Sequence, residues 1–287
     1  MSLKFKKPFS KPCETRYLLM LDFDETYYPH ACSSQQLQDL HHLEQYLDFL
    51  SRRFFLKIGW VTGSGLNQIA VKMERSRMNF SPHFIASDLG TELYEVTEKG
   101  DLMPNPIWEQ RLAKTRFSGS LVTGLVDELR YEYGIRLQEQ TNFGQARYKY
   151  NYYYLMESEA KSLYDLKIIE HLSKINGIAL NVNRCNPEAG DPDQAYDVDF
   201  IPQGTGKQEI AAFMMDHYGV PWENTMAFGD SGNDIGMLKA VRHGYLVGNA
   251  TDEAKGLHGM ICPFSYAAGI LHICKSIYQD EPFIESV

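Results

Sequence analysis

Blocks of hydrophobic and polar residues alternate along the chain and predict strands and helices in turn. Short apolar runs have the length of buried strands at three places, residues 17–21, 58–61 and 84–87. Leucines at helical spacing from Leu37 to Leu50 predict a helix that Ser33 or Ser34 can cap, and Ile69 and Met73 predict a second helix. The chain up to residue 90 therefore predicts the order β-α-β-α-β, which is typical of a parallel sheet with right-handed crossovers.

The pattern changes near residue 92 and returns after the middle third of the chain. In between it predicts a hairpin arm, two helices and three strands, at residues 92–96, 118–133, 157–175, 148–154, 178–183 and 196–201. Lys207 then opens a helix, and the α/β pattern continues with strands at 225–228 and 244–247 and a helix near 267–278. We therefore expect an α/β fold in two parts. Residues 1–90 and 199–287 form a Rossmann-like parallel-sheet core, and residues 91–198 form an inserted α+β domain.

Composition narrows the class of protein. Of the 287 residues, 44% are hydrophobic and 13% are aromatic, so the chain can bury a core. A formal net charge of −9 disfavours nucleic acid and anionic membranes as partners, and no run of about 18 apolar residues could span a bilayer. Residues 1–14 are expected to form a loose leader, which lacks the apolar segment of a secretory signal.

The cysteines suggest a compartment. All five are widely scattered and none has CxxC spacing, which indicates reduced thiols and argues against a zinc site. We expect a cytoplasmic protein that is a monomer or a weak homo-oligomer and has a small molecule as its partner.

Two acids, Asp22 and Asp24, directly follow the first predicted strand. In extended backbone they point to the same side, at the edge where open parallel sheets bind their ligands. Two converging carboxylates stay ionised together only when a cation neutralises them, and otherwise one of them holds a proton. Either state makes a reactive site. The alternative for this stretch alone is a pair of solvated acids at a strand end.

Three further loops carry candidate chemistry, at Thr62–Ser64, Lys207 and Asp230–Asp234. Because strand-end loops meet at one edge of a parallel sheet, we expect these residues to converge with Asp22. Clustered carboxylates without arginine partners indicate a hard divalent cation, and Mg²⁺ is the ion we expect. The hydroxyl of Thr62 and the ammonium of Lys207 can donate to phosphoryl oxygens. The combination is typical of phosphoryl transfer.

Two other patterns point elsewhere and are weaker. Gly204–Lys207 resembles part of a nucleotide-binding P-loop, but Gln208 stands where that motif needs Ser or Thr, so we reject it. The tyrosine-rich strand at 148–154 could stack on bases. The acidic composition favours a packed sheet face for it instead.

Four motifs in order resemble those of the haloacid dehalogenase superfamily: DFDET at 22–26, the strand ending in Thr62, Lys207, and GDSGND at 229–234. The resemblance implies that Asp22 is the nucleophile and Asp24 the general acid and base. It also implies that Asp22, the backbone carbonyl of Asp24 and Asp230 ligate Mg²⁺. Thr62 and Lys207 would then hold the phosphoryl oxygens, supported by Asn233 and Asp234. An acid at Asp24 indicates a phosphatase or a phosphomutase, because dehalogenases lack it.

The position of the insert, between the Thr62 and Lys207 motifs, resembles that of a C2-type cap, and its α+β pattern resembles the C2B subtype. Relatives with such caps act largely on sugar phosphates, including sucrose-phosphatase and phosphomannomutase, and the cap is expected to close over the site. Six longer stretches also resemble phosphatases of a 6-phosphorylated amino sugar. They are residues 22–30, 59–64, 82–92, 183–193, 196–207 and 228–234. Carboxylates suit an ammonium group, and amides and basic side chains suit hydroxyls. The candidate substrate-binding residues are Gly63, Ser64, His83, Asp88, Lys149, Asn183, Arg184 and Asp199.

Several of these residues can instead have a purely structural role. Arg184 can pair with an acid of the insert, His83 beside Pro82 can be structural, and the acids at 191–193 can belong to an ordinary turn. For the whole chain, the alternatives to a sugar phosphatase are a phosphomutase with the same first step and a non-catalytic regulator. The regulator requires a broken motif, and none of the four is broken.

Overall fold

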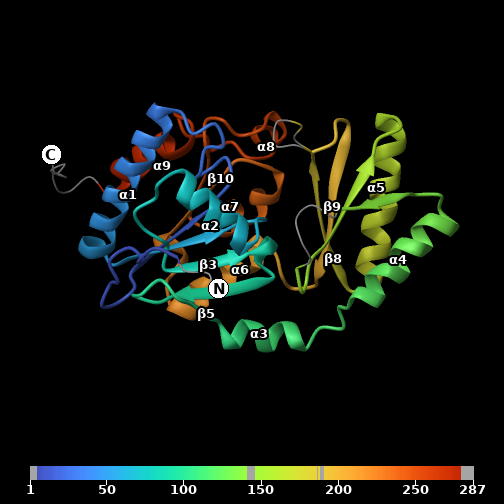
Figure 1. Cartoon of the computed structure of the whole chain (residues 1–287), viewed down its shortest axis with the longest axis horizontal. Coiled ribbons are helices and arrows are strands. Elements are labelled where there is room, and N and C mark those ends of the chain that lie inside the picture. The colour runs from blue at the N-terminus through green and yellow to red at the C-terminus, as the bar shows by residue number, and fades with distance from the viewer. Residues whose placement is uncertain (1–4, 141–145, 186, 188–190, 279–287) are drawn as a thin grey trace. The chain divides into compact units, whose positions relative to one another are not determined.

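The computed structural model describes residues 5–140, 146–185, 187 and 191–278. The chain divides into two compact units. Unit 1 consists of Met1–Pro106 and Lys207–Val287, and unit 2 consists of Ile107–Gly206. The order of the elements along the chain can be followed by colour in Figure 1.

In the described part of unit 1, seven strands form one sheet in the order β11-β10-β1-β2-β3-β4-β5. The strands are β1 (Tyr17–Leu21), β2 (Leu56–Val61), β3 (Phe84–Ser87), β4 (Glu92–Val96), β5 (Leu102–Pro104), β10 (Thr225–Gly229) and β11 (His243–Leu246). The strands from β11 to β3 are parallel, and β4 and β5 continue the sheet antiparallel. Leu21 is in register with Phe228 on one side and Trp60 on the other. The loops after β1, β2 and β10 therefore start at the same edge, which we call the carboxyl edge.

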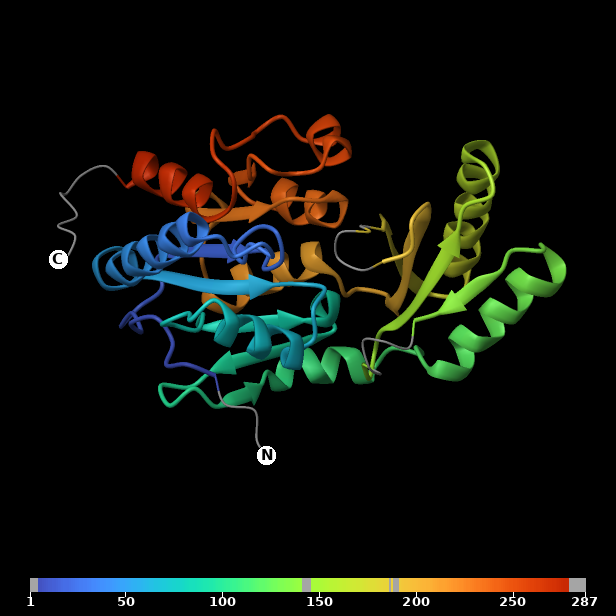
Figure 2. The same ribbon diagram turned by 45° about the horizontal axis from the view of Figure 1, so that its top comes forward.

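Helices cover this sheet. The helices of unit 1 are α1 (Ser34–Phe54), α2 (Leu66–Arg75), α6 (Lys207–Tyr218), α7 (Ile235–Ala240), α8 (Asp252–Leu257) and α9 (Tyr266–Ile277), with short 3₁₀ turns η1 (Asp88–Gly90), η3 (Trp222–Asn224) and η4 (Gly232–Asp234). Helices α1 and α9 pack against each other, as Figure 1 shows. In Figure 2, α1 (blue) and α2 (cyan) lie on the near side of the sheet.

Local sequence explains how α1 begins. Ser33 is its N-cap: the Ser33 side chain accepts a hydrogen bond from the Gln36 backbone, and the Gln36 side chain accepts one from the Ser33 backbone. This reciprocal pair satisfies two backbone donors that a helix start leaves open. Leu40, Leu43 and Leu47 then face the core. The predicted cap at Ser33 is confirmed.

The sequence predicts a loose leader over residues 1–14, and this prediction is wrong for the described part of the segment, from residue 5 onward. Phe5 and Phe9 are buried in the core of unit 1, and Pro8 forms a bridge with Ser81. Phe9 stacks on Phe80 with ring centroids 5.1 Å apart. Two isolated aromatics in a basic segment give no periodic signal, so only the tertiary packing reveals this part of the core.

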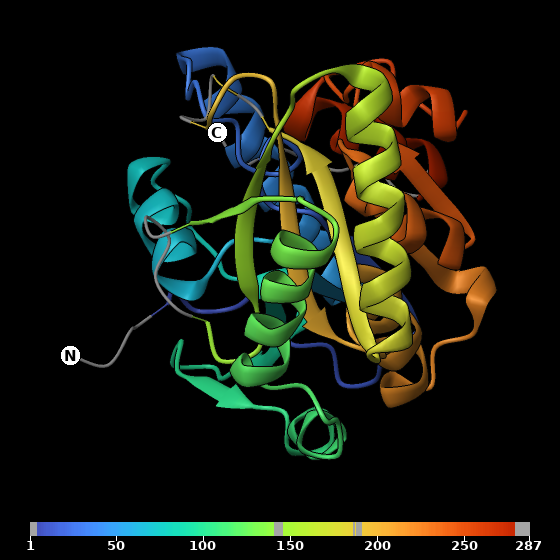
Figure 3. The ribbon, with the colours of Figure 1, turned by 90° about the vertical axis from the view of Figure 1, so that its right-hand side faces the viewer.

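Unit 2 has a sheet of its own. Within its described residues, four antiparallel strands follow the order β6-β7-β9-β8, with bounds β6 (Leu137–Glu139), β7 (Tyr150–Leu155), β8 (Ile178–Arg184) and β9 (Ala195–Pro202). Its helices are α3 (Pro106–Ala113), α4 (Gly119–Glu132) and α5 (Glu159–Ile175). Figure 3 shows α4 and α5 on one face of this sheet. Tyr152, Val198 and Phe200 pack beneath these helices, so the tyrosine-rich strand forms a packed face.

The structure corrects the expected domain boundaries. β4 and β5, which we had expected in the insert, pair with β3 in the sheet of unit 1, where Ser87 is in register with Glu92. β9 runs to Pro202, so the last strand of unit 2 crosses the expected boundary at 198. An antiparallel pair at the edge of a parallel sheet has the same local pattern as a hairpin in a separate domain, which is why the sequence misplaced it. None of the helices in the described part of the chain has the length and hydrophobicity that crossing a bilayer would require.

Candidate active site

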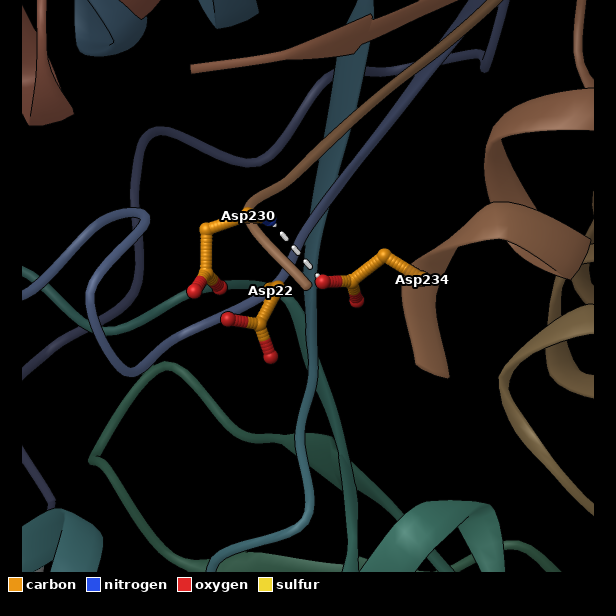
Figure 4. A group of neighbouring side chains, drawn as sticks. All are labelled: Asp22, Asp230 and Asp234. Atoms are coloured by element: carbon orange, nitrogen blue, oxygen red, sulfur yellow. Dashed lines mark hydrogen bonds between the residues drawn. The ribbon is translucent and has the colours of Figure 1, made fainter. Parts of the chain in front are cut away.

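Three carboxylates gather at the carboxyl edge of unit 1. Asp22 directly follows β1, and Asp230 directly follows β10, its parallel neighbour. The backbone N–H of Asp22 donates to the carbonyl of Phe228 at 2.9 Å, which continues the strand pairing up to the site. One oxygen each of Asp22, Asp230 and Asp234 lie within 4.8 Å of one another. Figure 4 shows the three side chains, with Asp234 joined to the backbone of Asp230.

Lys207 ties this group together. It is the first residue of α6 and is almost fully buried. Its ammonium lies 2.6 Å from Asp22 Oδ1 and 2.7 Å from Asp234 Oδ1. The predicted convergence of Asp22, Lys207 and the loop at 230–234 is therefore present in the structure.

Asp234 supports the loop that carries Asp230. Its Oδ2 accepts hydrogen bonds from the backbone N–H groups of Asp230 and Ser231, at 3.0 and 3.1 Å. Gly229 fits only because it has no side chain, since a Cβ there would lie 2.3 Å from the Cβ of Asp234. Asn233 accepts a hydrogen bond from Ser231 within the same loop. Both oxygens of Asp234 are thus engaged inside the protein.

The remaining oxygens of Asp22 and Asp230 differ from those of Asp234. Thr26 donates to Asp230 Oδ1 at 3.0 Å, and Lys207 donates to Asp22 Oδ1. Among the described residues, no donor reaches Asp22 Oδ2 or Asp230 Oδ2. Two carboxylate oxygens without donors, close together at a strand edge, are suited to a hard divalent cation.

Burial and mutual repulsion shift the titration of this group. Burial raises the pKa of Asp22 to about 7, with Lys207 opposing the shift and Asp234 adding to it. Burial and the neighbouring Asp22 raise the pKa of Asp230 well above its usual range. The pKa of Lys207 is also raised, because Asp22 and Asp234 outweigh the cost of burying its charge. Ionising all three buried carboxylates together thus costs free energy unless a cation neutralises part of their charge.

A second group of polar side chains surrounds Asp24. Ser64 Oγ donates to Asp24 Oδ2 at 2.6 Å, and Thr62 Oγ1 lies 3.5 Å from the same oxygen. On the other side, Lys72 Nζ lies 2.5 Å and His30 Nε2 lies 3.0 Å from Asp24 Oδ1. Burial alone would raise the pKa of Asp24. The hydrogen bonds from His30 and Lys72 outweigh burial and hold its pKa well below the usual range.

Sequence reasoning missed Lys72 and His30. His30 lies in the loop that carries Asp24, so its place six residues further on was an available signal. Lys72 lies on α2, two turns after Ser64, and its ammonium also reaches Ser64 Oγ at 3.0 Å. A lysine on an amphipathic helix carries no such signal, because the sequence does not say which face of the helix turns toward the sheet edge.

Three of the expected substrate-binding residues lie near this loop. Gly63 and Ser64 directly follow Thr62, and the backbone N–H of Asp88 donates to the carbonyl of Ser64 at 3.2 Å. Asp88 follows β3 and has φ +52°, a left-handed conformation that non-glycine residues adopt at some cost. A Cβ on Gly65 would lie 3.5 Å from both carboxylate oxygens of Asp88. Asp88 is thus held beside the Thr62–Ser64 loop.

His83 is a correction. It precedes β3 and therefore lies at the opposite edge of the sheet, which we call the amino edge. Its Nδ1 accepts a hydrogen bond from the backbone of Ile58 at 2.9 Å, and its Nε2 donates to the carbonyl of Ser10 at 3.3 Å. Both ring nitrogens bind the backbone, so His83 is a structural residue and we remove it from the candidate site.

The other expected residues lie in unit 2. Asn183 and Asp199 belong to β8 and β9, on the face of the sheet opposite to the apolar core formed with α4 and α5. On the same face Asn181 donates to Asp199 at 3.0 Å and Gln140 donates to Asp197 at 2.7 Å. Burial, followed by the charge of Asp199, raises the pKa of Asp197 to about 6. This polar face concentrates carboxylates and amides.

Arg184 and Lys149 are placed differently from each other. Strand alternation places Arg184 on the face opposite to Asn183, in register with Tyr196, so Arg184 does not join the polar group. Lys149 directly precedes β7 and lines a cavity of about 250 Å³ together with Asn151. Asn186, whose amide is a further candidate donor for a sugar hydroxyl, lies outside the described residues.

The known proteins to which this chain is similar are phosphatases and hydrolases. The model of the family described as sucrose-6F-phosphate phosphohydrolase matches residues 15–260. Kanosamine-6-phosphate phosphatase of Bacillus subtilis (strain 168) is 45% identical over 262 residues, which cover 91% of this chain and 93% of that protein. The crystal structure of yhjK, a haloacid dehalogenase-like hydrolase from Bacillus subtilis, is 43% identical, covers 95% of each chain and has a TM-score of 0.74.

A more distant structure shares the fold. Sucrose-phosphatase from Synechocystis sp. PCC6803, solved in complex with sucrose and phosphate, has a TM-score of 0.70 at 19% identity, covering 92% of this chain and 98% of that one. At this identity the likeness concerns the arrangement of the elements. The resemblance that the four motifs indicated therefore extends over nearly the whole chain.

Proposed function

We propose that this chain, which belongs to the sucrose-6F-phosphate phosphohydrolase family of haloacid dehalogenase-type phosphatases, removes the phosphate from kanosamine 6-phosphate in a Mg²⁺-dependent reaction. Its activity class is that of a phosphoric monoester hydrolase. The observation that carries the proposal is the buried group of Asp22, Lys207 and Asp234 beside Asp230.

The residues fit a divalent cation. Asp22 Oδ2 and Asp230 Oδ2 are the carboxylate oxygens without donors in the described part of the site, and with the backbone carbonyl of Asp24 they would hold the ion. When bound, Mg²⁺ supplies charge neutralisation that lets an anionic phosphate approach an anionic carboxylate. Burial, with repulsion among the carboxylates added, raises the pKa of Asp22 and Asp230, and a cation held there would offset both effects.

Asp22 carries out the bond-making step. Its carboxylate attacks phosphorus, the bond between phosphorus and the sugar oxygen breaks, and an acyl phosphate forms on Asp22. Lys207, fixed between Asp22 and Asp234, holds the ionised carboxylate and offers its ammonium to the phosphoryl oxygens. Thr62, which is buried beside Asp24, adds a hydroxyl donor.

Asp24 moves the protons. It gives a proton to the departing sugar oxygen and then takes one from the water that hydrolyses the acyl phosphate, so that the two steps balance. Ser64, Lys72 and His30 fix the orientation of its carboxylate. Lys72 Nζ, 2.5 Å from Asp24 Oδ1, and His30 Nε2, 3.0 Å from the same oxygen, are the groups with which Asp24 can exchange a proton.

The polar face of unit 2 supports an amino-sugar substrate. Kanosamine carries an ammonium group, and the relative with this name is a phosphatase of its 6-phosphate. Asp197 and Asp199 provide carboxylates for a cation, while Asn181 and Asn183 provide amides for hydroxyls. Burial and then the charge of Asp199 raise the pKa of Asp197, and a bound ammonium would offset both effects. The five scattered cysteines of the chain, which we expect to be reduced, suit an enzyme of the cytosol.

The test is a substrate panel assayed with Mg²⁺ and with EDTA: kanosamine, glucosamine, glucose and mannose 6-phosphates, together with sucrose 6F-phosphate. We expect free phosphate to be released at least about 10-fold faster from the first than from the others, because an ammonium–carboxylate contact contributes about 1.5–3 kcal/mol. Asp199→Asn should remove that preference while leaving glucose 6-phosphate turnover unchanged. Equal rates would remove the kanosamine assignment, and retention of a sugar bisphosphate instead of release of phosphate would identify a phosphomutase.

Asp22→Asn tests the nucleophile. We expect kcat to fall by at least about 1,000-fold, because an amide cannot form the acyl phosphate. Asp252→Asn, at the exposed start of α8, is the matched control and should keep full activity. Circular dichroism and thermal unfolding of both variants check the fold. Substantial turnover by a folded Asp22→Asn enzyme would show that another group attacks phosphorus.

A further inference from the structure

A cavity of about 570 Å³ lies in unit 1 at the amino edge of the sheet. Its walls come from the starts of β2 and β3, the end of the antiparallel β4 and the loop that follows it. The active-site loops follow the carboxyl ends of the same parallel strands. The cavity and the carboxylate group of Asp22 therefore lie at opposite edges of one sheet, and the proposed reaction does not use the cavity.

Lys57, the second residue of β2, lines the cavity and is only 8% exposed. Its ammonium lies 4.8 Å from the centre of the Tyr218 ring. Within the residues that the structure describes, no hydrogen bond or ion pair joins Lys57 to another group. Burial lowers its pKa, with Glu95 opposing this effect and Lys11 adding to it. A cation on so little exposed a side chain, with no hydrogen-bond acceptor among the described residues, is suited to receive an acceptor from a ligand in the cavity.

The polar groups next to Lys57 have partners. Both carboxylate oxygens of Glu95 accept from the Tyr218 hydroxyl, at 2.8 and 2.9 Å, and His217 lies 3.6 Å from one of them. His83 uses both ring nitrogens on the backbone. Among Lys57, Glu95 and His83 as the structure describes them, Lys57 alone thus lacks a hydrogen-bonding partner, and it is a cation.

We propose that this cavity is a second small-molecule site, in which an anionic group, a phosphate or a carboxylate, binds to Lys57. Lys11, which also lines the cavity, adds a second positive charge. The volume lies in the range of small-molecule sites. The rim carries both signs, with Lys99 beside Glu98 and Asp101, so a ligand that also bears a positive group is accommodated with its anion inward.

The test measures binding by isothermal titration calorimetry on the full chain in phosphate-free buffer with EDTA. The probes are succinate and inorganic phosphate, which separate the carboxylate from the phosphate source. Lys57→Met keeps the length of the side chain and removes the charge, whereas Lys57→Arg keeps the charge. Lys239→Met, on the exposed face of α7, is the matched control. Phosphate at the catalytic site contributes equally to all four proteins, so the difference between them reports on the cavity.

We expect at least one probe to bind the wild-type chain and the Lys239→Met control equally. Lys57→Met should weaken this binding at least about 10-fold, which is the loss typical of a charge-assisted hydrogen bond, and Lys57→Arg should restore most of it. A second measurement needs no variant: a probe that binds should slow the acetylation of Lys57 relative to Lys239, read by peptide mass spectrometry. The proposal is overturned if neither probe binds, or if Lys57→Met binds both as the wild type does. Neither readout depends on catalysis, so the outcome is independent of the proposed function.

Discussion

At the scale of single residues, Asp24 shows how the site is controlled by groups outside the motifs. Four side chains surround its carboxylate, and two of them, Lys72 and His30, are cationic or can become so. The Lys72 ammonium bridges Asp24 Oδ1 and Ser64 Oγ, at 2.5 and 3.0 Å. A carboxylate held from both sides keeps one orientation, which a proton donor to the leaving group requires.

Lys72→Met should therefore slow turnover of the sugar phosphate about 10- to 100-fold in kcat/KM, which is part of the roughly 10²–10⁴-fold that positioned acid catalysis contributes. It should slow 4-nitrophenyl phosphate much less, because 4-nitrophenolate leaves without protonation. Since kcat/KM reports the steps up to the first release of product, later hydrolysis of the acyl phosphate does not enter the comparison. Lys72→Arg, which keeps the charge, should restore part of the loss. An equal loss on both substrates would show that Lys72 acts through the fold or through phosphate binding.

At the scale of elements, the amino edge of the sheet is joined by a buried histidine. His83 binds the backbone of β2 at Ile58 and the N-terminal segment at Ser10, and the residue is 3% exposed. Burial, with the charge of Lys57 added, lowers the pKa of His83 to about 4. The neutral ring that these contacts need is lost when His83 is protonated.

His83 should therefore make the stability of unit 1 depend on pH. Between its folded pKa of about 4 and the ordinary value near 6.5, the unfolded chain binds the proton and the folded chain does not. The contribution of His83 to the free energy of unfolding is complete above pH 6.5. It falls as the pH drops toward 4, and about 2 kcal/mol is lost at pH 4.5. Urea unfolding at pH 7 and 4.5 should show His83→Gln losing less stability on acidification than the wild type. His272→Gln on the exposed side of α9 should behave as the wild type, and parallel pH slopes for all three would contradict the assignment.

At the scale of the whole molecule, the chain forms two units that each have a sheet and a core. Unit 2 is one continuous stretch, and α4, α5 and the apolar face of its sheet enclose a core that includes Val198 and Phe200. Unit 1 is assembled from two separate stretches, because β10 pairs with β1 across the insertion. The group of Asp22, Asp230 and Asp234 therefore depends on pairing between residues about 200 positions apart, whereas unit 2 depends on contacts within itself.

Residues 107–206 expressed alone should therefore fold. We expect a cooperative urea transition with a free energy of unfolding of about 5 kcal/mol, as is usual for a domain of this size. Far-UV circular dichroism and a dispersed amide NMR spectrum provide the measurement. Val198→Asp places a charge in the buried core and should abolish the transition, while Glu170→Gln on the surface of α5 should leave it unchanged. A non-cooperative transition would show that unit 2 requires unit 1.

The sequence by itself determined the chemistry of the site. The apolar strand before Asp22, the loop after Val61 and the glycine-flanked acids at 230–234 are local patterns. Strand-end placement in a parallel sheet follows from such patterns, and Asp22, Lys207, Asp230 and Asp234 do meet. Gly229 and Ser33 could be interpreted in the same way, because a close approach and a helix cap are local constraints.

Only the tertiary structure decided which distant groups complete these patterns. Lys72 reaches Asp24 because one face of α2 turns toward the loop, and Lys57 faces a cavity because β4 and the loop after it leave space there. β4 pairs with the edge of β3, and β5 pairs with β4, so both belong to the sheet of unit 1. The alternation of residues in β4 and β5 does not specify which sheet they extend. Periodicity specifies which residues share a face. What that face meets depends on long-range packing, which is why the carboxylates at the carboxyl edge followed from the sequence while Lys72, His30 and Lys57 did not.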